Sequence, residues 1–257
     1  MTLGPDEKSR RTADLVGVAA WAGGEFRRSG KLLVRRADGF TDRANGAVAL
    51  DSLDEHEAAQ LVDEASAAAR ADDVVDRWQV SDHETPLAAV LEGRGAVFGS
   101  PTFVMTRVAP AEPGPGAATD PPLAVDGAVS AAWFDVWLEG NGRRQREDPS
   151  WVQTARRFFE RLPAAVPEAR FVHTDGAVGL GVTVGGRFGE PTAHYVGCMA
   201  TRPELRGRGL GSAVLRAACG DGLTVLQVEE GNPAIELYRR AGFEVSHRYH
   251  HVQLPAV

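Results

Sequence analysis

The chain has 257 residues, of which 43% are hydrophobic and 25% are charged, and its formal net charge at pH 7 is -7. This mixture is ordinary for a folded globular protein and allows one large domain or two modest ones. The acidic balance argues against a nucleic acid as the main partner, because binding a phosphate backbone needs an excess of Lys and Arg. A cationic or amine-bearing small molecule suits the charge better.

Cysteine usage and hydropathy bear on the compartment. The sequence contains two cysteines, Cys198 and Cys219, and no Cys/His spacing that resembles a metal site. We therefore expect no metal and a reducing, cytoplasmic location. The N-terminal residues lack the apolar core of a secretion signal, and no run of about 18 apolar residues occurs, so we expect no membrane partner.

The first half of the chain alternates strand-like and helical patterns. Ser52 and Glu55 have the spacing of a capping box, and an apolar helical stripe follows them. Pro86 lies in the first turn of a short helix that a glycine ends. The predicted elements are strands at 31–36, around 78–80 and at 102–108, and helices over the stripe from Leu53 to Ala69 and over 85–95.

A proline-rich segment separates the two halves. Residues 109–122 read APAEPGPGAATDPP, in which five of 14 residues are proline and most of the others are Ala or Gly. This composition cannot build a packed element and is typical of a semi-rigid spacer. We therefore predict one domain at 1–108, a linker at 109–122 and a second domain at 123–257.

The second half mixes helices and strands with short connections, which indicates an α/β class. Two helical patterns, AAWFDVWLEG and WVQTARRFFERL, precede three strand-like segments, RFVHT, GLGVTV and AHYVGCMAT. A glycine-rich segment then leads into a helix, which is followed by strand LTVLQV, helix PAIELYRRAG and strand FEVSHRYHHVQL. We interpret the HRYHH run as mixed surface and core, not as a metal cluster.

The glycine-rich segment, RGRGLG at 206–211, lies between a strand and a helix. Apolar residues at i, i+3, i+4, i+7 and i+8 from Leu210 predict a helix that begins near Gly209. The unpaired N–H groups of a helix start attract phosphate, glycines let it approach, and Arg206 and Arg208 add charge. The segment matches neither a Walker loop nor G-x-G-x-x-G. The alternative is a plain glycine-rich turn with solvated arginines.

Two motifs together resemble the GNAT superfamily of N-acetyltransferases. Residues 206–211 have the [R/Q]-x-x-G-x-[G/A] signature of acetyl-CoA binding, with Pro203 in the usual lead-in. Residues 231–245, GNPAIELYRRAGFEV, are similar to the family's N-x-x-A-x-x-L-Y-x-x-x-G-F pattern. The resemblance covers the chain from about residue 128 onward and implies a GNAT fold with a mixed sheet. Asn232, Leu237, Tyr238, Gly242 and Phe243 carry the second motif.

The resemblance implies that acetyl-CoA is a co-substrate whose pyrophosphate binds the backbone N–H groups of the helix start. The end of the preceding strand would lie beside the thioester, and one N–H there would polarise the acyl carbonyl. Asn232, which precedes Pro233, also fits a helix cap. The expected cofactor-binding residues are Met199, Ala200, Thr201, Arg206, Gly207, Arg208, Gly209, Leu210, Gly211, Ser212, Asn232 and Tyr238.

By the same resemblance, Tyr238 is the acid that protonates the departing thiolate, although its place on an apolar stripe also fits core packing. Many relatives carry a glutamate on the strand before the pyrophosphate loop, but AHYVGCMAT contains no acid. Glu229, at the end of the next strand, is the first choice for the general base. The alternatives are Glu230, His194, His173 and a base that acts through water.

The first half contains a weak echo of the second. Thr85–Pro86 corresponds to Asn232–Pro233, and Gly95 and Gly242 follow at the same distance. This repeat predicts two tandem copies of one fold.

The copy in the first half lacks the cofactor motifs. Residues 43–48 keep Arg43 and Gly46 of the glycine frame but have Val48 in place of its last glycine, and Leu91 stands at the tyrosine position. We therefore expect a degenerate unit that does not catalyse, but shapes the acceptor cleft and buries one face of the second unit.

The predicted activity is direct transfer of an acetyl group from acetyl-CoA to a primary amine of a small molecule, such as an amino acid, a polyamine or an amine-bearing antibiotic. The alternatives are a protein lysine or N-terminus as acceptor, and a non-catalytic acyl-CoA-binding regulatory module. A homodimer is one alternative for the assembly. Trp133, Trp137 and Trp151 would either line the acceptor cleft or pack in the core.

Overall fold

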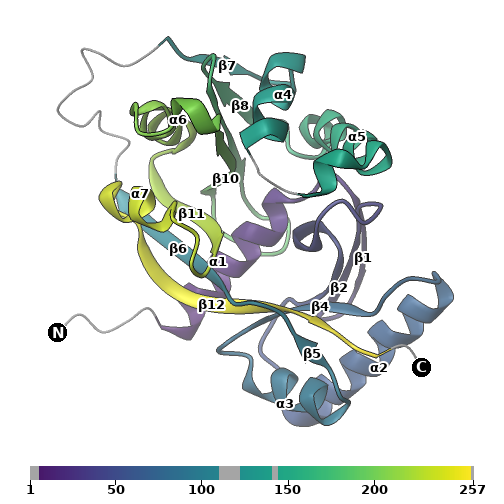
Figure 1. The fold of residues 1–257 in the computed structure, drawn as a ribbon. Helices are drawn as coiled ribbons and strands as arrows, with labels where there is room; N and C mark the ends of the chain where they lie inside the picture. The colour runs from purple at the N-terminus through teal and green to yellow at the C-terminus, as the bar shows by residue number, and fades with distance from the viewer. Residues whose placement is uncertain (1–5, 110–121, 141–143, 256–257) are drawn as a thin grey trace.

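The computed structural model describes residues 6–109, 122–140 and 144–255 (Figure 1). Within these ranges the strands form one sheet in the order β1-β2-β3-β4-β12-β6-β11-β10-β9-β8-β7, with β5 beside β12. Parallel and antiparallel pairs both occur, which confirms the predicted mixed α/β class. None of the helices in these ranges has the length and hydropathy that a membrane crossing needs.

The elements of the first half are α1 (Glu7–Ala20), β1 (Glu25–Ser29), β2 (Leu32–Arg36), β3 (Gly46–Ala49), α2 (Glu55–Ala71), β4 (Arg77–Ser81), α3 (Thr85–Gly93), β5 (Val97–Phe98) and β6 (Thr102–Ala109). Those of the second half are β7 (Ala124–Asp126), α4 (Ala131–Gly140), α5 (Pro149–Ala165), β8 (Arg170–His173), β9 (Ala177–Val184), β10 (Ala193–Thr201), α6 (Leu210–Ala218), β11 (Gly222–Glu229), α7 (Ile235–Arg240) and β12 (Glu244–Gln253). Most of the predicted linker, residues 110–121, lies outside the described ranges, and the predicted domain bounds stay a prediction.

The two halves of the chain exchange strands. β6 belongs to the first half, but it pairs along its whole length with β11 of the second half. β12 starts beside β6, and its last five residues, 249–253, pair with β4 of the first half. Figure 1 shows β12 running from the second unit across to β4 and β5. Each unit is therefore completed by a strand of the other.

Each half repeats one order of elements: strand, helix, parallel strand, short helix. β3, α2, β4 and α3 supply this order in the first half, and β10, α6, β11 and α7 supply it in the second. Gly95 and Gly242 follow the short helices with φ of +77° and +86°. Both positions need the left-handed conformation that glycine tolerates. The tandem arrangement is thus confirmed.

The proposed match between residues 43–48 and RGRGLG is wrong. Gly46 begins β3, so this segment precedes its strand, whereas RGRGLG follows one. The structural counterpart of RGRGLG is the connection between β3 and α2, residues 50–54. It contains Asp51 and Asp54 where the second unit has glycines and arginines. Two carboxylates at a helix start repel a phosphate, which agrees with a degenerate first unit.

The capping box of α2 also differs from the prediction. The Asp54 side chain accepts the N–H of Glu57 at 2.8 Å, and the Glu57 carboxylate accepts the N–H of Asp54 at 3.1 Å. Ser52 instead donates its hydroxyl to Glu7 at 2.8 Å. Helix α2 therefore begins after Asp54, since only there can both donors be satisfied.

Helix α1 was missed by the sequence analysis. Its first turns are polar, whereas every residue from Val16 to Ala20 is buried. Its apolar residues therefore form a block rather than a stripe, and no helical periodicity results. The helix packs against β9, β10 and β11, and after its end Trp21 donates its Nε1–H to the Tyr195 hydroxyl at 2.9 Å. The first half thus buries one face of the second unit.

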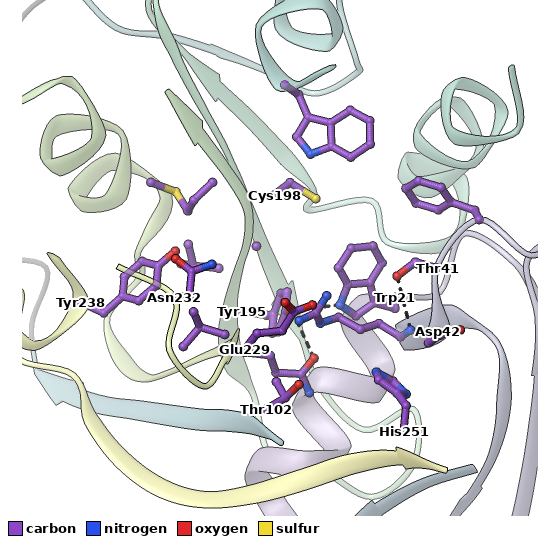
Figure 2. Close-up of a pocket in the computed structure, with 18 of the residues that line it drawn as sticks. Trp21, Thr41, Asp42, Thr102, Tyr195, Cys198, Glu229, Asn232, Tyr238 and His251 are labelled. Carbon is purple, nitrogen blue, oxygen red and sulfur yellow. Dashed lines mark hydrogen bonds between the residues drawn. The ribbon is translucent and has the colours of Figure 1, made fainter. Parts of the chain in front are cut away.

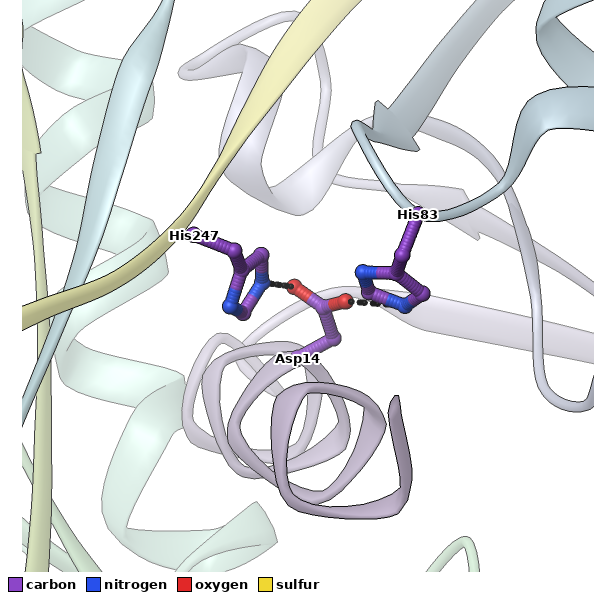
Figure 3. A group of neighbouring side chains, drawn as sticks. All are labelled: Asp14, His83 and His247. Atoms are coloured by element: carbon purple, nitrogen blue, oxygen red, sulfur yellow. Dashed lines mark hydrogen bonds and ion pairs between the residues drawn. The ribbon is translucent and has the colours of Figure 1, made fainter. Parts of the chain in front are cut away.

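Asp14 of α1 ties the two halves together (Figure 3). Its Oδ1 lies 2.8 Å from Nε2 of His247 on β12, and its Oδ2 accepts the Ser81 hydroxyl at 2.7 Å. Nε2 of His83 lies 3.5 Å from the same Oδ2. Burial lowers the pKa of His83, so this ring is neutral despite the nearby carboxylate. The network fixes the crossing of β12 over α1, and it places His247 of the HRYHH run in the core.

Candidate active site

β10 and β11 separate part of the way along their length. They are parallel, and their pairing ends at Val196 and Leu226. Just beyond this point the register of β10 against β9 shifts between Gly197 and Ala200, and Cys198 has φ of +54°. Such a bulge leaves backbone groups without a partner in the ladder. The strands therefore open into a notch that exposes the β10 backbone.

The glycine-rich loop leads from this notch into α6. Gly207 and Gly209 have φ of +77° and +80°, and a Cβ at either position would meet nothing within 4 Å. Gly209 caps α6 without a side-chain hydrogen bond. The space beside both glycines is thus open at the start of a helix, which is the geometry that an anion needs to approach the first-turn N–H groups.

A cavity of about 660 Å³ begins at the notch and reaches the first half of the chain. In Figure 2, Asn232 and Tyr238 lie on one side, and Trp21, Thr41, Asp42 and His251 on the other, with Tyr195 and Glu229 between them. Both halves of the chain therefore build this cavity. Its lining includes residues 39–43, Arg77, 195–199, 227–229, Asn232, Tyr238 and His251.

Tyr238, on α7, lines this cavity with a side chain that is only 7% exposed. Burial raises the pKa of its hydroxyl to about 12. The hydroxyl is therefore protonated at neutral pH, which an acid that donates to a thiolate requires.

Only one of the predicted base candidates lines the cavity. Glu229 does so from the end of β11 with an exposed side chain. Glu230 turns away and forms an ion pair with Arg248 at 3.2 Å. The ring of His194 lies 3.1 Å from the Thr183 hydroxyl, and that of His173 lies 3.0 Å from Asp126.

The expected cofactor residues lie around the notch. Met199, Asn232 and Tyr238 line the cavity, Ala200 and Thr201 end β10, and residues 206–212 form the loop and first turn of α6. A Cβ at Gly211 would come within 3.3 Å of the Thr201 hydroxyl, so loop and strand end pack closely.

Asn232 does not cap α7 directly. Its side chain accepts the N–H of Ala234 at 2.9 Å, and the helix begins only at Ile235. The helix therefore begins two residues later than predicted, but the side chain of Asn232 makes the predicted capping hydrogen bond to the N–H two residues further on. This hydrogen bond still holds Asn232 at the cavity.

The tryptophans divide between cleft and core. Trp137 and Trp151 line the cavity and stack with their ring centroids 5.9 Å apart. Phe40 packs against Trp151 at 5.5 Å. Trp133 is fully buried and donates its Nε1–H to the Gly179 carbonyl at 3.1 Å, so it belongs to the core.

Residues 168–245 match the model of the acetyltransferase (GNAT) domain family. A GCN5-related N-acetyltransferase from Kribbella flavida has a similar structure, with a TM-score of 0.63 and 17% identity over 97% of this chain and 95% of that one. A tandem GNAT protein from the clavulanic acid biosynthesis pathway has a TM-score of 0.55 and 18% identity over 99% of this chain and 98% of that one. A putative GNAT acetyltransferase from Novosphingobium aromaticivorans has a TM-score of 0.54 and 18% identity over 95% of this chain and 99% of that one. The comparison with curated proteins gives no match.

The fold thus has the tandem arrangement of the solved tandem GNAT structure. The second half of the chain contains a GNAT acetyltransferase domain, as its motifs predicted.

Proposed function

We propose that the chain transfers an acetyl group directly from acetyl-CoA to the primary amine of a small molecule, in the cytoplasm. One observation carries this proposal: the notch between β10 and β11 continues into the open N-terminus of α6. Such a path suits a long molecule with a diphosphate at one end and a reactive group at the other.

Each part of the path has a separate task. The first-turn N–H groups of α6 and the loop glycines hold the diphosphate, and acetyl-CoA supplies the thioester. A backbone N–H of the β10 bulge donates to the acyl oxygen, where negative charge develops. Glu229 takes the proton of the amine as the nitrogen–carbon bond forms. The carbon–sulfur bond then breaks, and Tyr238 gives its proton to the sulfur.

The test measures thiol release and the mass of the acetylated product across a panel of small amines. We expect Tyr238→Phe to lower kcat at least tenfold with little change in the Kd of acetyl-CoA, since a general acid contributes roughly 10²–10⁴-fold to a rate. A module that only binds acyl-CoA would bind it without any turnover, and that result would overturn the proposal.

Glu229→Gln tests the base, and Glu230→Gln is its matched control. The two acids are neighbours and both are exposed, but Glu230 faces Arg248 and does not line the cavity. We expect only Glu229→Gln to lower kcat. Equal effects of both variants would remove Glu229 from the mechanism.

A further inference from the structure

The end of the cavity that lies in the first half of the chain is basic. Arg43 and Arg77 both line it. Arg77 is neutralised, because its guanidinium donates to Asp42 at 2.8 Å. Arg43 forms no ion pair with any described residue; its side chain hydrogen-bonds to Tyr249, and its buried Nε has no hydrogen-bond partner among the described residues. The cavity therefore contains a guanidinium with unused donor capacity.

A second arginine behind Arg43 adds to this positive charge. Arg35 is 1% exposed, and it donates to the Arg43 carbonyl and to Gln79 at 3.3 Å. It too has no acidic partner within the described ranges. Burial together with three neighbouring arginines lowers the pKa of His251 to about 3, so this histidine is neutral. These arginines are Arg43, Arg35 and Arg77.

The groups that face Arg43 from the other elements are mostly uncharged. Tyr195 of β10, Tyr249 of β12 and Tyr238 of α7 carry hydroxyls, and Glu229 of β11 is the acid within electrostatic reach. Burial alone would lower the pKa of Arg43, but Tyr249 and other neighbours, Glu229 among them, raise it above its usual value. The guanidinium stays charged, with a carboxylate near it but not bonded to it.

A guanidinium without a bonded carboxylate in a partly closed cavity is costly, because it has lost water without gaining an anion. A planar guanidinium matches the two oxygens of a carboxylate, and such pairs are among the stronger hydrogen bonds. An amine that arrives with its own carboxylate would satisfy Arg43. Its nitrogen would then point toward the notch, where Glu229 and the β10 bulge lie.

Aromatic side chains also line the cavity. Trp137 and Trp151 stack with ring planes 17° apart, and Phe40 packs beside them. Trp137 and Phe40 are only 4% and 3% exposed, so the half-buried Trp151 is the ring that a ligand reaches most easily. Aromatic walls bind apolar and aromatic groups through large contact areas.

We infer that Arg43 is the binding site for a carboxylate of the acceptor, and that the acceptor is an α-amino acid with an apolar or aromatic side chain. This inference rests on the proposed acetyl transfer and names the class of amine that it uses. Arg43 belongs to the degenerate unit. By this inference it determines which amine is used in the reaction that the other unit carries out.

The experiment compares each amino acid with its own carboxamide, in the pairs phenylalanine and phenylalaninamide, and leucine and leucinamide. Each pair keeps the side chain and removes only the negative charge. We expect kcat/KM, expressed per neutral amine, to be at least about tenfold higher for the carboxylate. Arg43→Gln removes this preference by raising the KM of the amino acids, and Arg43→Lys keeps part of it. The matched control is Arg161→Gln, because Arg161 is exposed and lies 3.8 Å from Asp38. This variant should change neither the preference for the carboxylate nor the KM of the amino acids.

The outcomes separate the two claims. If no amine of either series is acetylated although acetyl-CoA binds, the proposed function fails. If the carboxamides react as well as the amino acids in the unaltered protein, acetyl transfer stands and the inference about Arg43 is overturned. That comparison needs no variant, so it decides the question even if Arg43→Gln does not fold. An amine with a phosphate that outperforms the amino acids would also overturn the carboxylate assignment.

Discussion

His251 is a half-buried histidine whose charge is opposed by its surroundings. Burial and neighbouring arginines lower its pKa to about 3 from an ordinary value of 6.5. Between these two values the unfolded chain binds a proton that the folded chain does not, so the free energy of unfolding falls as the pH falls. We expect His251→Gln to reduce this loss between pH 6.5 and 4. Urea unfolding at several pH values measures it.

The matched control is His56→Gln. His56 is exposed on α2, where its ring lies 3.0 Å from the Gln60 amide. This variant should follow the unaltered protein at every pH. If His251→Gln showed the same acid sensitivity as the control, the proton uptake on unfolding would have to come from other groups, such as His83.

Single residues of the site differed in how far the sequence could predict them. Tyr238 was found because a motif with fixed spacing contains it, Asn232 lies one residue after the asparagine position of that motif, and both line the cavity. Arg43 was noticed only as part of a glycine frame that the structure does not support. Arg77 gave no signal, and His251 was noticed only as part of the HRYHH run, because both reach the cavity through β4 and β12, which pair only after the strand exchange.

At the scale of elements, the loop before α6 supports a prediction about the cofactor. Gly209 is left-handed with φ of +80°, as is Gly186 with φ of +76° in the connection between β9 and β10. A Cβ at either position meets open space. An alanine at Gly209 or at Gly186 should therefore lower the free energy of unfolding by about 1 kcal/mol, through backbone strain alone. Only Gly209→Ala also places a methyl group where a phosphate approaches α6.

We therefore expect Gly209→Ala to raise the Kd of acetyl-CoA about tenfold, and Gly186→Ala to leave it unchanged. Calorimetric titration gives the Kd, and thermal unfolding shows whether the two variants are matched in stability. An equal Kd for both would mean that the diphosphate does not lie on the start of α6.

Elements with a clear period were predictable, and those whose burial is uneven along their length were not. α6 was predicted because its apolar stripe recurs at helical spacing from Leu210. α1 was missed because its apolar residues form a block, and that block is buried only because the second unit covers it. The start of α2 was misplaced by two residues, since Ser52 and Asp54 both precede an acid at the required spacing.

At the scale of the whole molecule, the proline-rich segment divides the sequence into two halves, but the strands of both halves form one sheet. Composition locates a change along the chain, whereas strand pairing depends on distant segments that no local pattern specifies. Because β6 completes the second unit and β12 completes the first, neither unit keeps its full sheet without the other. The exchange also brings residues 39–43 to the notch, so the cavity exists only in the joined protein.

The strand exchange predicts how the chain behaves when it is divided. Fragments 1–109 and 122–257, produced together, should form a stable 1:1 complex that acetylates the same amines, because every strand pair of the described sheet lies within or between them. Fragment 122–257 alone should aggregate, since removing β6 exposes the apolar edge of β11 and uncovers the face that α1 buries. Size-exclusion chromatography and thermal unfolding distinguish these results. A fragment 122–257 that stayed monomeric and melted at the temperature of the whole chain would show that the second unit does not depend on the exchanged strand.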